Sequence, residues 1–408
     1  MALRVEPSAE RALRGGHPWL FGDSIREMSR EAPHGSVGVV FDRKGRFLAV
    51  GLLDSEGPIR LRVLASGKPA RIGPDLFRER IRNALDLRED LVSDRGTTGY
   101  RILSGENDGM PGLVVDQYGD SLVLKIYSLS WGPHLRDVVS SLEAELSPNA
   151  VLLLAARRVT GSPLAPPALQ EPALLHGTLS DHGTLSFLER GLRFEAHPLL
   201  GHKTGFYLDQ RENRARVEDL VRREAERTGG TALPVLNVFS YTGGFSLAAA
   251  RGGATEVVSV DASGPALRQA ERHFELNRDD PRVARARHRT LEGDAFGILS
   301  ELADAGERFR MVILDPPSFA KDASQVRRAL AGYQRLTRLG LSVLAPGGLL
   351  VQASCSSRIP EEEFHSAVHA AALQARRPLE EVERTGHPVD HPVTFPEGAY
   401  LKCLFARA

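Results

Sequence analysis

Short runs of hydrophobic residues, separated by turn sequences, characterise the first 70 residues of the chain. Val, Leu and Ile are concentrated at residues 36–40, 46–52 and 59–63, with Asp-Arg-Lys-Gly and Asp-Ser-Glu-Gly-Pro between them. Because Asp, Gly and Pro favour tight turns, this pattern predicts three strands of a small β-barrel. Residues 74–92 then place apolar side chains at helical spacing and predict a linking helix.

The next segment, residues 98–185, has the pattern of a small α+β unit. Two apolar runs flank Asp-Gln-Tyr-Gly-Asp, a sequence that is typical of a hairpin turn. The Pro- and Ala-rich residues 160–172 predict a loop. The other predicted elements are strands at 113–115, 122–126 and 150–155 and a helix at 132–145.

From about residue 186 the pattern changes to strands that alternate with helices. Continuous apolar runs are typical of buried parallel strands, and they occur at 235–239, 256–260, 311–314 and 349–353. Helices are predicted at 244–251, 264–277, 324–343 and 361–374, and a last strand over 396–408. This alternation predicts a doubly wound α/β sheet, which binds ligands beyond the carboxyl ends of its strands.

The length of 408 residues agrees with several domains, and we divide the chain into residues 1–72, 73–185 and 186–408. No apolar run approaches the roughly 20 residues that cross a bilayer, and the N-terminus lacks the features of a secretory signal. The two cysteines exclude a disulfide framework and disfavour a cysteine-based zinc site. We therefore expect a cytoplasmic protein without a metal site and without membrane association.

The charges of the chain are balanced, since Lys+Arg and Asp+Glu both number 52. Bulk charge thus gives no support to nucleic-acid binding, and an RNA would need a local basic surface. Arg14 and His17 are candidates for such a surface, together with the Arg-rich residues 71–88. For any single arginine, a solvated surface position is the simpler interpretation.

Three of the predicted strands end in residues that suit an adenosyl ligand. Gly243 and Gly244 lack Cβ atoms, so the backbone could approach a ligand there, although a tight turn would also use them. Asp261 could accept hydrogen bonds from two ribose hydroxyls, or it could cap the next helix. Asp294 follows the position where a third strand is expected, between the runs at 256–260 and 311–314. It could bind an adenine amino group beside Phe296, and a helix cap is again the alternative.

The fourth and fifth strands end in residues that could act on a substrate. Asp315-Pro-Pro-Ser-Phe has two prolines, which fix a rigid turn beyond the sheet edge. Cys355 stands among small hydroxyl residues at a strand end; a core thiol is the default for a lone cysteine, but this position also favours a thiolate. Carbon-5 of a pyrimidine becomes nucleophilic when a thiolate adds to carbon-6, so a carbon-methylating enzyme needs a cysteine here. Cys403, in the last predicted strand, is interpreted as a core residue.

Three longer runs carry a resemblance that covers nearly the whole chain: Arg14-Gly-Gly-His-Pro-Trp-Leu-Phe, the run from Tyr100 to Asp116, and the run from Gly201 to Arg214. With the strand-end motifs, they resemble the bacterial 23S ribosomal RNA (cytosine-5) methyltransferases that have an N-terminal PUA domain. The resemblance implies a PUA-like RNA-binding domain, a central α+β domain and a seven-stranded Rossmann-like class I methyltransferase domain. It also implies S-adenosyl-L-methionine as cofactor and 23S rRNA before full subunit assembly as partner, and a homodimer is a possible assembly.

The resemblance also implies roles for individual residues. Cys355 corresponds to the family's nucleophile, and Asp315 is expected near the target base. Pro317 and Ser318 stand where some related enzymes carry a second cysteine, so a base or water must assist release of the thiolate. Asp390-His391-Pro392 resembles an element near the active site, whereas residues 156–176 depart from the family pattern. The implied cofactor contacts are Lys203, Phe206, Asp209, Arg211, Ser240, Gly243, Gly244, Asp261, Asp294, Ala295, Phe296, Asp315 and Pro316.

Three functions stay open at this point. Cytosine-5 methylation of ribosomal RNA is favoured by Cys355 at its strand end. Methylation of a base nitrogen, or of another base, would leave Cys355 as a packing residue. An RNA-binding protein without turnover would retain only the cofactor pocket, and the complete set of Gly243, Gly244, Asp261 and Asp315 disfavours it.

Overall fold

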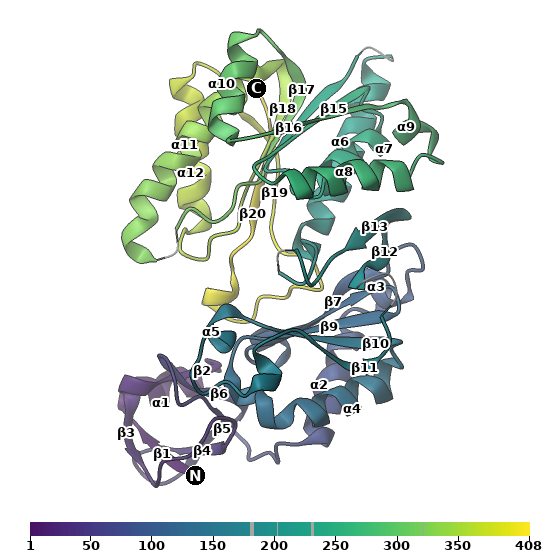
Figure 1. Cartoon of the computed structure of the whole chain (residues 1–408). Helices are drawn as coiled ribbons and strands as arrows, with labels where there is room; N and C mark the ends of the chain where they lie inside the picture. The colour runs from purple at the N-terminus through teal and green to yellow at the C-terminus, as the bar shows by residue number, and fades with distance from the viewer. Residues whose placement is uncertain (180–182, 202, 230–231, 321) are drawn as a thin grey trace. The chain divides into compact units, whose positions relative to one another are not determined.

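The computed structural model describes residues 1–179, 183–201, 203–229, 232–320 and 322–408. The chain forms two compact units (Figure 1). The first contains residues 1–191, 195–208 and 389–398, and the second contains residues 192–194, 209–388 and 399–408. The chain therefore returns to the first unit for one short segment before it completes the second.

The N-terminal part of the first unit is a six-stranded sheet in the order β2-β6-β5-β4-β1-β3. Its core contains Leu3, Val40 and Leu61, all of which are fully buried. The predicted strands at 36–40, 46–52 and 59–63 are confirmed as β4, β5 and β6. The short β1, β2 and β3 were not predicted, because three or four residues give too little alternation to recognise. The elements are β1 (Ala2–Val5), α1 (Pro7–Arg14), β2 (Trp19–Phe21), β3 (Ile25–Met28), β4 (Val37–Phe41), β5 (Phe47–Leu53) and β6 (Ile59–Ser66).

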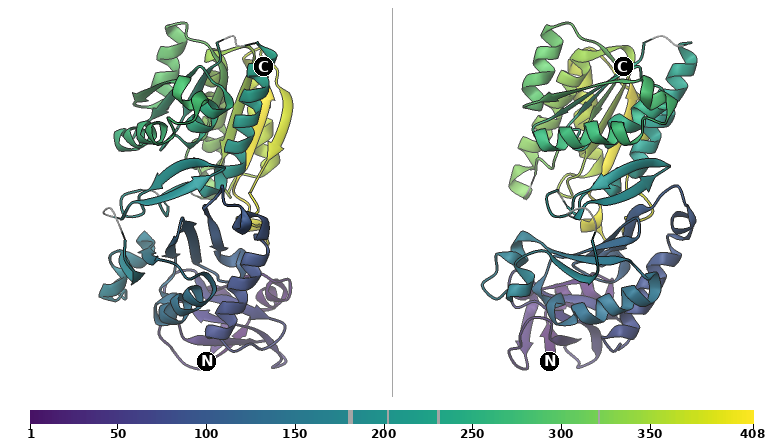
Figure 2. Two further views of the ribbon diagram at one scale, coloured as in Figure 1. Left: turned by 90° about the vertical axis from the view of Figure 1, so that its right-hand side faces the viewer. Right: turned by 45° about the vertical axis from the view of Figure 1, so that its right-hand side comes forward.

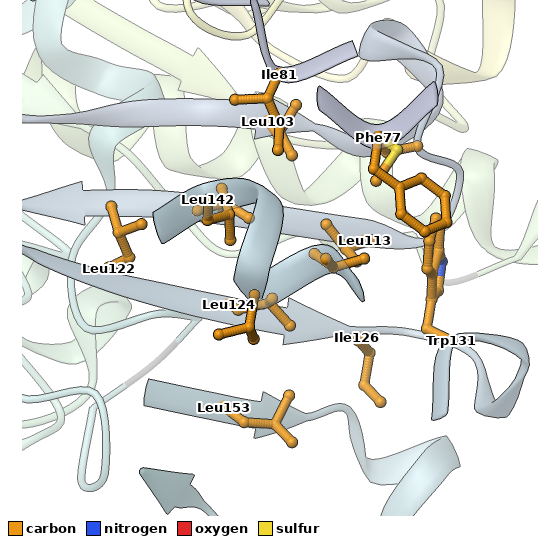
Figure 3. Packing of buried hydrophobic residues seen from close by; sticks show 14 of the residues in the cluster. Phe77, Ile81, Leu103, Leu113, Leu122, Leu124, Ile126, Trp131, Leu142 and Leu153 are labelled. Atoms are coloured by element: carbon orange, nitrogen blue, oxygen red, sulfur yellow. The ribbon is translucent and has the colours of Figure 1, made fainter. Parts of the chain in front are cut away.

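The rest of the first unit is built on a five-stranded sheet in the order β11-β10-β9-β8-β7. Phe77 and Trp131 pack together in its core, with ring centroids 5.7 Å apart (Figure 3). The elements are α2 (Pro74–Asp86), α3 (Glu89–Ser93), β7 (Gly99–Ser104), β8 (Leu113–Tyr118), β9 (Ser121–Ile126), α4 (Leu135–Leu146), β10 (Ala150–Ala155), α5 (Arg157–Thr160) and β11 (Ala173–Gly177).

Two predictions in this region need correction. The helix predicted over 74–92 is interrupted between α2 and α3, where the Arg88 side chain turns into the core and donates to the backbone oxygen of Arg101. The helix predicted at 132–145 begins only at Leu135, because Pro133 lies in a preceding 3-10 segment. The strands at 113–115, 122–126 and 150–155 are confirmed, and a short 3-10 turn lies inside the predicted loop at 160–172.

Strands β12 (Leu185–Glu189) and β13 (Leu192–Ala196) form a two-stranded sheet, and the boundary between the units falls within β13. The second unit then contains a seven-stranded sheet in the order β16-β15-β14-β17-β18-β20-β19. Strands β14 to β18 are parallel, whereas β20 is antiparallel to both of its neighbours. This sheet confirms the predicted doubly wound fold.

Helices cover both faces of the seven-stranded sheet. Helices α6, α7 and α8 pack on one face and α10, α11 and α12 on the other (Figure 2). The strands and helices of this unit are α6 (Arg211–Arg227), β14 (Pro234–Val238), α7 (Gly244–Gly252), β15 (Glu256–Asp261), α8 (Gly264–Leu276), α9 (Pro281–Arg285), β16 (Arg287–Glu292), α10 (Ala295–Asp304), β17 (Phe309–Leu314), α11 (Val326–Val343), β18 (Leu344–Ser354), α12 (Glu361–Gln374), β19 (Glu380–Thr385) and β20 (Lys402–Arg407).

The predicted strands and helices of this unit are confirmed to within two residues at each end, except for the last strand and for β18, which begins at Leu344, five residues before the predicted start. The last strand is confined to β20, since residues 396–398 form a 3-10 turn. Strand β19, Glu-Glu-Val-Glu-Arg-Thr, was missed because it is a charged edge strand with little apolar content. The strand order reverses between β14 and β17, so the carboxyl ends of these two strands border the crevice where such sheets bind ligands.

Candidate active site at the carboxyl edge of the sheet

The loop from β14 to α7 has an unusual backbone. Phe239, Tyr241 and Gly243 have φ angles of 63°, 47° and 75°, in the left-handed region that non-glycine residues rarely adopt. At Gly243 a Cβ atom would lie 2.7 Å from the Cβ of Ala270, so a side chain does not fit there. Gly244 is the first residue of α7. This turn thus brings the backbone and the start of a helix to the switch point of the sheet.

Asp261 holds this loop in place. Its two carboxylate oxygens accept hydrogen bonds from the backbone N–H groups of Tyr241, at 2.8 Å, and Ser263, at 2.9 Å. The helix-cap interpretation of Asp261 is wrong, because the cap of α8 is Ser263, whose hydroxyl accepts from Ala266. A carboxylate has about four lone-pair positions, so Asp261 retains acceptor capacity toward a ligand.

Two hydroxyl groups in the same loop provide a test of whether an adenosyl cofactor fits. The side-chain oxygens of Ser240 and Thr242 are buried, and neither has a hydrogen-bond partner within the described residues. Buried hydroxyls are normally paired, so an unpaired pair beside a glycine turn suits the polar groups of a ligand. The residues at this edge therefore fit S-adenosyl-L-methionine.

The segment after β16 is a helix start with an aromatic neighbour. Asp294 caps α10, because its carboxylate accepts a hydrogen bond from the N–H of Gly297 at 2.9 Å. The helix cap that the sequence offered as an alternative role for Asp294 is therefore confirmed. Ala295 is buried, and the Phe296 ring lies 4.7 Å below the guanidinium carbon of Arg335. Phe296 also lines a cavity together with Ser318, Phe319 and Arg335. The cap uses one carboxylate oxygen of Asp294 in this contact, which leaves the other available for an adenine amino group.

Asp315 is held at the end of β17 by a hydrogen-bond chain from α6. The side-chain amide of Gln210 donates to its carboxylate at 2.9 Å, and Asn213 in turn donates to the Gln210 oxygen at 2.6 Å. Thr385 of β19 donates to Asn213. Gln210 and Asn213 were not singled out from the sequence, because their contact with Asp315 joins segments about 100 residues apart and no local pattern marks it.

Cys355 lies directly after β18, next to the Asp-Pro-Pro turn. Its Sγ donates to the backbone oxygen of Pro316 at 3.8 Å, and Pro316 is itself buried. Cys355 is partly exposed, whereas Cys403 is fully buried in β20 and burial raises the pKa of its thiol well above the usual value. The structure thus brings Cys355, Asp315 and Pro316 together and confirms Cys403 as a core residue.

The run from Gly201 to Arg214 divides between the two units. Asp209 accepts from the Tyr400 hydroxyl at 2.9 Å, and the buried Arg211 donates to Glu212 at 3.1 Å, both in the second unit. Lys203 and Phe206 belong to the first unit, where Phe206 packs on Phe187. Their predicted contacts with the cofactor stay predictions, and His202 in this run lies outside the described residues.

The predicted RNA-binding residues lie in the first unit, and both have partners there. Arg14 donates to Asp42 at 2.9 Å and to Glu10 at 3.1 Å. His17 lies 3.6 Å from a Glu397 oxygen and packs edge-on against Trp19, with ring centroids 5.7 Å apart. Phe21 and Phe395 complete this aromatic cluster. Its rings, with Phe21 38% exposed, were not identified as a candidate stacking surface from the sequence.

Asp390 and His391 also belong to the first unit. The Asp390 carboxylate accepts from the N–H of Arg101 at 2.9 Å, and its backbone oxygen accepts from Arg88 at 3.1 Å. Arg88 forms a fully buried ion pair with Asp108 at 2.7 Å. These contacts anchor residues 389–398 to β7. The Asp390-His391-Pro392 motif therefore has a structural role in the first unit.

Within the described ranges, no group of three or more His, Cys, Asp or Glu side chains is arranged to hold a metal ion. Among the helices that the structure describes, none combines the length and apolarity needed to cross a bilayer.

Comparison with known proteins gives two family matches. Residues 175–407 match a family described as S-adenosylmethionine-dependent methyltransferase, and residues 3–66 match a PUA-like domain. A protein named ribosomal RNA large subunit methyltransferase from Deinococcus radiodurans is 44% identical over 99% of this chain and 97% of its own length. A protein named ribosomal RNA large subunit methyltransferase I from Shewanella denitrificans is 36% identical over the full length of both.

Solved structures share the fold over the whole chain. A candidate S-adenosylmethionine-dependent methyltransferase from Streptococcus mutans superposes with a TM-score of 0.81 at 22% identity, covering 100% of both chains. A structure of a candidate methyltransferase complexed with S-adenosylhomocysteine gives a TM-score of 0.82, also at 22% identity and with 100% coverage of both chains. At this level of identity the likeness concerns the fold alone.

Proposed function

The chain belongs to the family of S-adenosylmethionine-dependent methyltransferases, and on that premise we propose that it methylates carbon-5 of a cytosine in large-subunit ribosomal RNA. The names of the two relatives, at 44% and 36% identity, support ribosomal RNA as the substrate. The observation that supports carbon-5 is the position of Cys355. This residue is partly exposed, follows β18 directly, and lies against the Pro316 oxygen beside the turn that carries Asp315.

The proposed reaction follows from what a thiolate does to a pyrimidine ring. Bound S-adenosyl-L-methionine supplies an electrophilic methyl group. The Cys355 thiolate would form a bond to carbon-6, which makes carbon-5 nucleophilic. Carbon-5 would then accept the methyl group as the bond from that group to the cofactor sulfur breaks and S-adenosylhomocysteine leaves. Loss of the carbon-5 proton to a base or water restores the double bond as the bond between sulfur and carbon-6 breaks. Asp315, fixed by Gln210, would hold the base in the orientation that this sequence of steps requires.

The proposed cofactor contacts divide by the part of the molecule they would hold. Asp261 would accept bonds from the ribose hydroxyls, and Ser240 and Thr242 would pair with polar groups beside the glycine turn. Asp294, Ala295 and Phe296 would border the adenine. We assign the remaining contacts to Lys203, Phe206, Asp209, Arg211, Gly243, Gly244, Asp315 and Pro316.

We propose that the domain over residues 1–72 binds the RNA, with domains at 73–185 and 186–408 completing the enzyme. The match of residues 3–66 to a PUA-like domain and the aromatic cluster around His17 and Trp19 support this assignment. Arg14 would contribute less than its charge alone implies, because Asp42 and Glu10 already neutralise it. The proposed substrate is 23S rRNA before full assembly of the subunit, in the cytoplasm.

Nucleoside mass spectrometry of 23S rRNA tests this proposal. RNA from a strain that lacks the protein should lack one 5-methylcytidine, and a plasmid carrying the wild-type chain should restore it. A plasmid carrying Cys355→Ser should not restore it, whereas Cys403→Ser should. Loss of a nitrogen-methylated nucleoside instead, or restoration by Cys355→Ser, would refute the carbon-5 assignment.

A further inference from the structure

A buried lysine lies at the carboxyl edge of the seven-stranded sheet, beside the Cys355 strand end. Lys402 is the first residue of β20, and the antiparallel register pairs it with Ser354, the residue before Cys355. Only 5% of Lys402 is exposed, although lysine is among the residues that are least often buried. Neither the sequence motifs nor the proposed reaction assigns it a role.

The Lys402 ammonium group donates hydrogen bonds to neutral oxygens. Its Nζ donates to the backbone oxygen of Ser356 and to that of Tyr400, the latter at 3.2 Å. No carboxylate lies within ion-pair distance of it among the residues that the structure describes, and Glu361 acts on it only from farther away. A buried charge without a counter-ion is costly, so this ammonium group favours an anion nearby.

The titratable groups that face Cys355 come from several elements. Lys402 approaches from β20, Asp315 from the end of β17, and Tyr333 from α11, where its hydroxyl donates to Ser354 at 2.9 Å. Burial raises the pKa of Tyr333, so this phenol stays neutral at physiological pH. Asp315 carries the same sign as a thiolate and opposes its formation, whereas Lys402 carries the opposite sign and favours it.

Burial lowers the pKa of Lys402 to about 8, and the negative charge of a Cys355 thiolate acts in the opposite direction and raises it. This interaction is reciprocal: an ammonium group that is stabilised by a thiolate stabilises the thiolate equally. The hydrogen bond from Lys402 to the backbone oxygen of Ser356 puts the ammonium group next to Cys355 along the chain, where the two charges would stabilise each other.

We propose that the buried ammonium group of Lys402 holds Cys355 as a thiolate, so that the nucleophile forms before substrate binds. This inference rests on the proposed role of Cys355 in the reaction. Lys402 acts here as a positioning residue. The thiol proton leaves to water, which ends the hydrogen bond that Cys355 donates to the Pro316 oxygen, and the ammonium group keeps its own proton.

Alkylation of the whole protein by iodoacetamide, without RNA or cofactor, tests the proposal. Peptide mass spectrometry gives separate rates for Cys355 and for Cys403, which is fully buried and adjacent to Lys402. Protection of Cys403 thus reports that the variant remains folded at this position. Because the reaction contains no RNA, its result is independent of whether carbon-5 is methylated.

At pH 7 we expect Lys402→Met to slow the alkylation of Cys355 by about tenfold or more, the effect of a shift of one unit in the thiol pKa. Lys402→Arg, which retains a cation, should stay within about threefold of the wild type. Equal Cys355 rates in the wild type and Lys402→Met, with Cys403 protected, would overturn the proposal.

The wild-type pH profile keeps the proposal testable even where Lys402→Met fails to fold. The alkylation rate of Cys355 should reach half of its maximum at a pH below about 8.5, the ordinary value for a cysteine thiol. A midpoint at or above that value would show that the ammonium group does not activate the thiol, and would overturn the proposal.

Discussion

The two edges of the seven-stranded sheet hold polar side chains in opposite ways. At the amino edge, Glu224 of α6 accepts from Arg227 and Arg310 and lies 3.5 Å from Arg407. At the carboxyl edge, the hydroxyls of Ser240 and Thr242 lack partners within the described residues, and the loop that carries them has a strained backbone. One edge uses its polar groups for stability, and the other leaves them available to a ligand.

This difference explains why the strand-end motifs are informative about function. A buried polar group without a partner and a left-handed non-glycine residue both reduce stability, so they persist where binding or catalysis requires them. The charge cluster around Glu224 at the amino edge stabilises the fold that carries them.

The largest effect is expected at Cys355. Cys355→Ser should reduce methyl transfer by at least about a thousandfold, because a serine hydroxyl is not ionised at neutral pH. Binding of S-adenosyl-L-methionine should stay within about twofold, since the adenosyl contacts come from other strand ends. Single-turnover assays and calorimetry measure the two quantities, with Cys403→Ser as the matched control. Normal turnover by Cys355→Ser would make Cys355 a packing residue.

A smaller effect is expected at Asp261. Asp261→Ala should weaken binding of S-adenosyl-L-methionine by about 1.5–3 kcal/mol, through loss of charge-assisted bonds to the ribose. It also removes the acceptor of the Tyr241 and Ser263 N–H groups, so the free energy of unfolding should fall as well. Isothermal titration calorimetry measures the affinity for S-adenosyl-L-methionine. Unchanged affinity in a folded variant would show that Asp261 only supports the loop.

The smallest effect is expected at the amino edge and depends on pH. Hydrogen bonds from Arg227 and Arg310 lower the pKa of Glu224 to about 2 from an ordinary 4.5. Its carboxylate therefore stabilises the fold above pH 4.5, and this contribution is lost as the pH falls toward 2. Glu224→Gln should cost about 1–2 kcal/mol at pH 7, a figure reduced for the partial exposure of the arginines.

Urea unfolding at several pH values measures that contribution. The difference in unfolding free energy between the wild type and Glu224→Gln should shrink as the pH falls below 4.5. Binding of S-adenosyl-L-methionine at pH 7 should be the same for both proteins. A variant that bound the cofactor poorly while remaining stable would contradict the division of roles between the two edges.

The sequence predicted the second unit better than the first because its strands are long, apolar and buried on both faces. Their ends carry Gly243, Asp261, Asp315 and Cys355, and the fold brings these residues to one edge. What the sequence could not predict were contacts between distant segments. Gln210 with Asp315, Arg14 with Asp42 and Lys402 beside Cys355 all depend on tertiary pairing. No local pattern contains that information.

The charged residues illustrate the same limit. Arg14 was predicted to face RNA because of its charge, and the structure pairs it with Glu10 and with the fully buried Asp42. The break between α2 and α3 likewise follows from the Arg88 side chain, which pairs with Asp108 in the core. Helical spacing continues through residues 87 and 88, so the sequence alone gave no reason to end the helix there.

The central claim, that Cys355 attacks carbon-6 of a cytosine, is tested most directly by trapping the covalent adduct. RNA substrate carrying 5-fluorocytosine should form a stable protein–RNA adduct with the wild type in the presence of S-adenosyl-L-methionine, because fluorine cannot leave carbon-5 as a proton does. Peptide mapping should place the adduct on Cys355. We predict an adduct with Cys403→Ser and none with Cys355→Ser. An adduct with Cys355→Ser, or no adduct with a wild-type enzyme that methylates the unmodified RNA, would contradict the account.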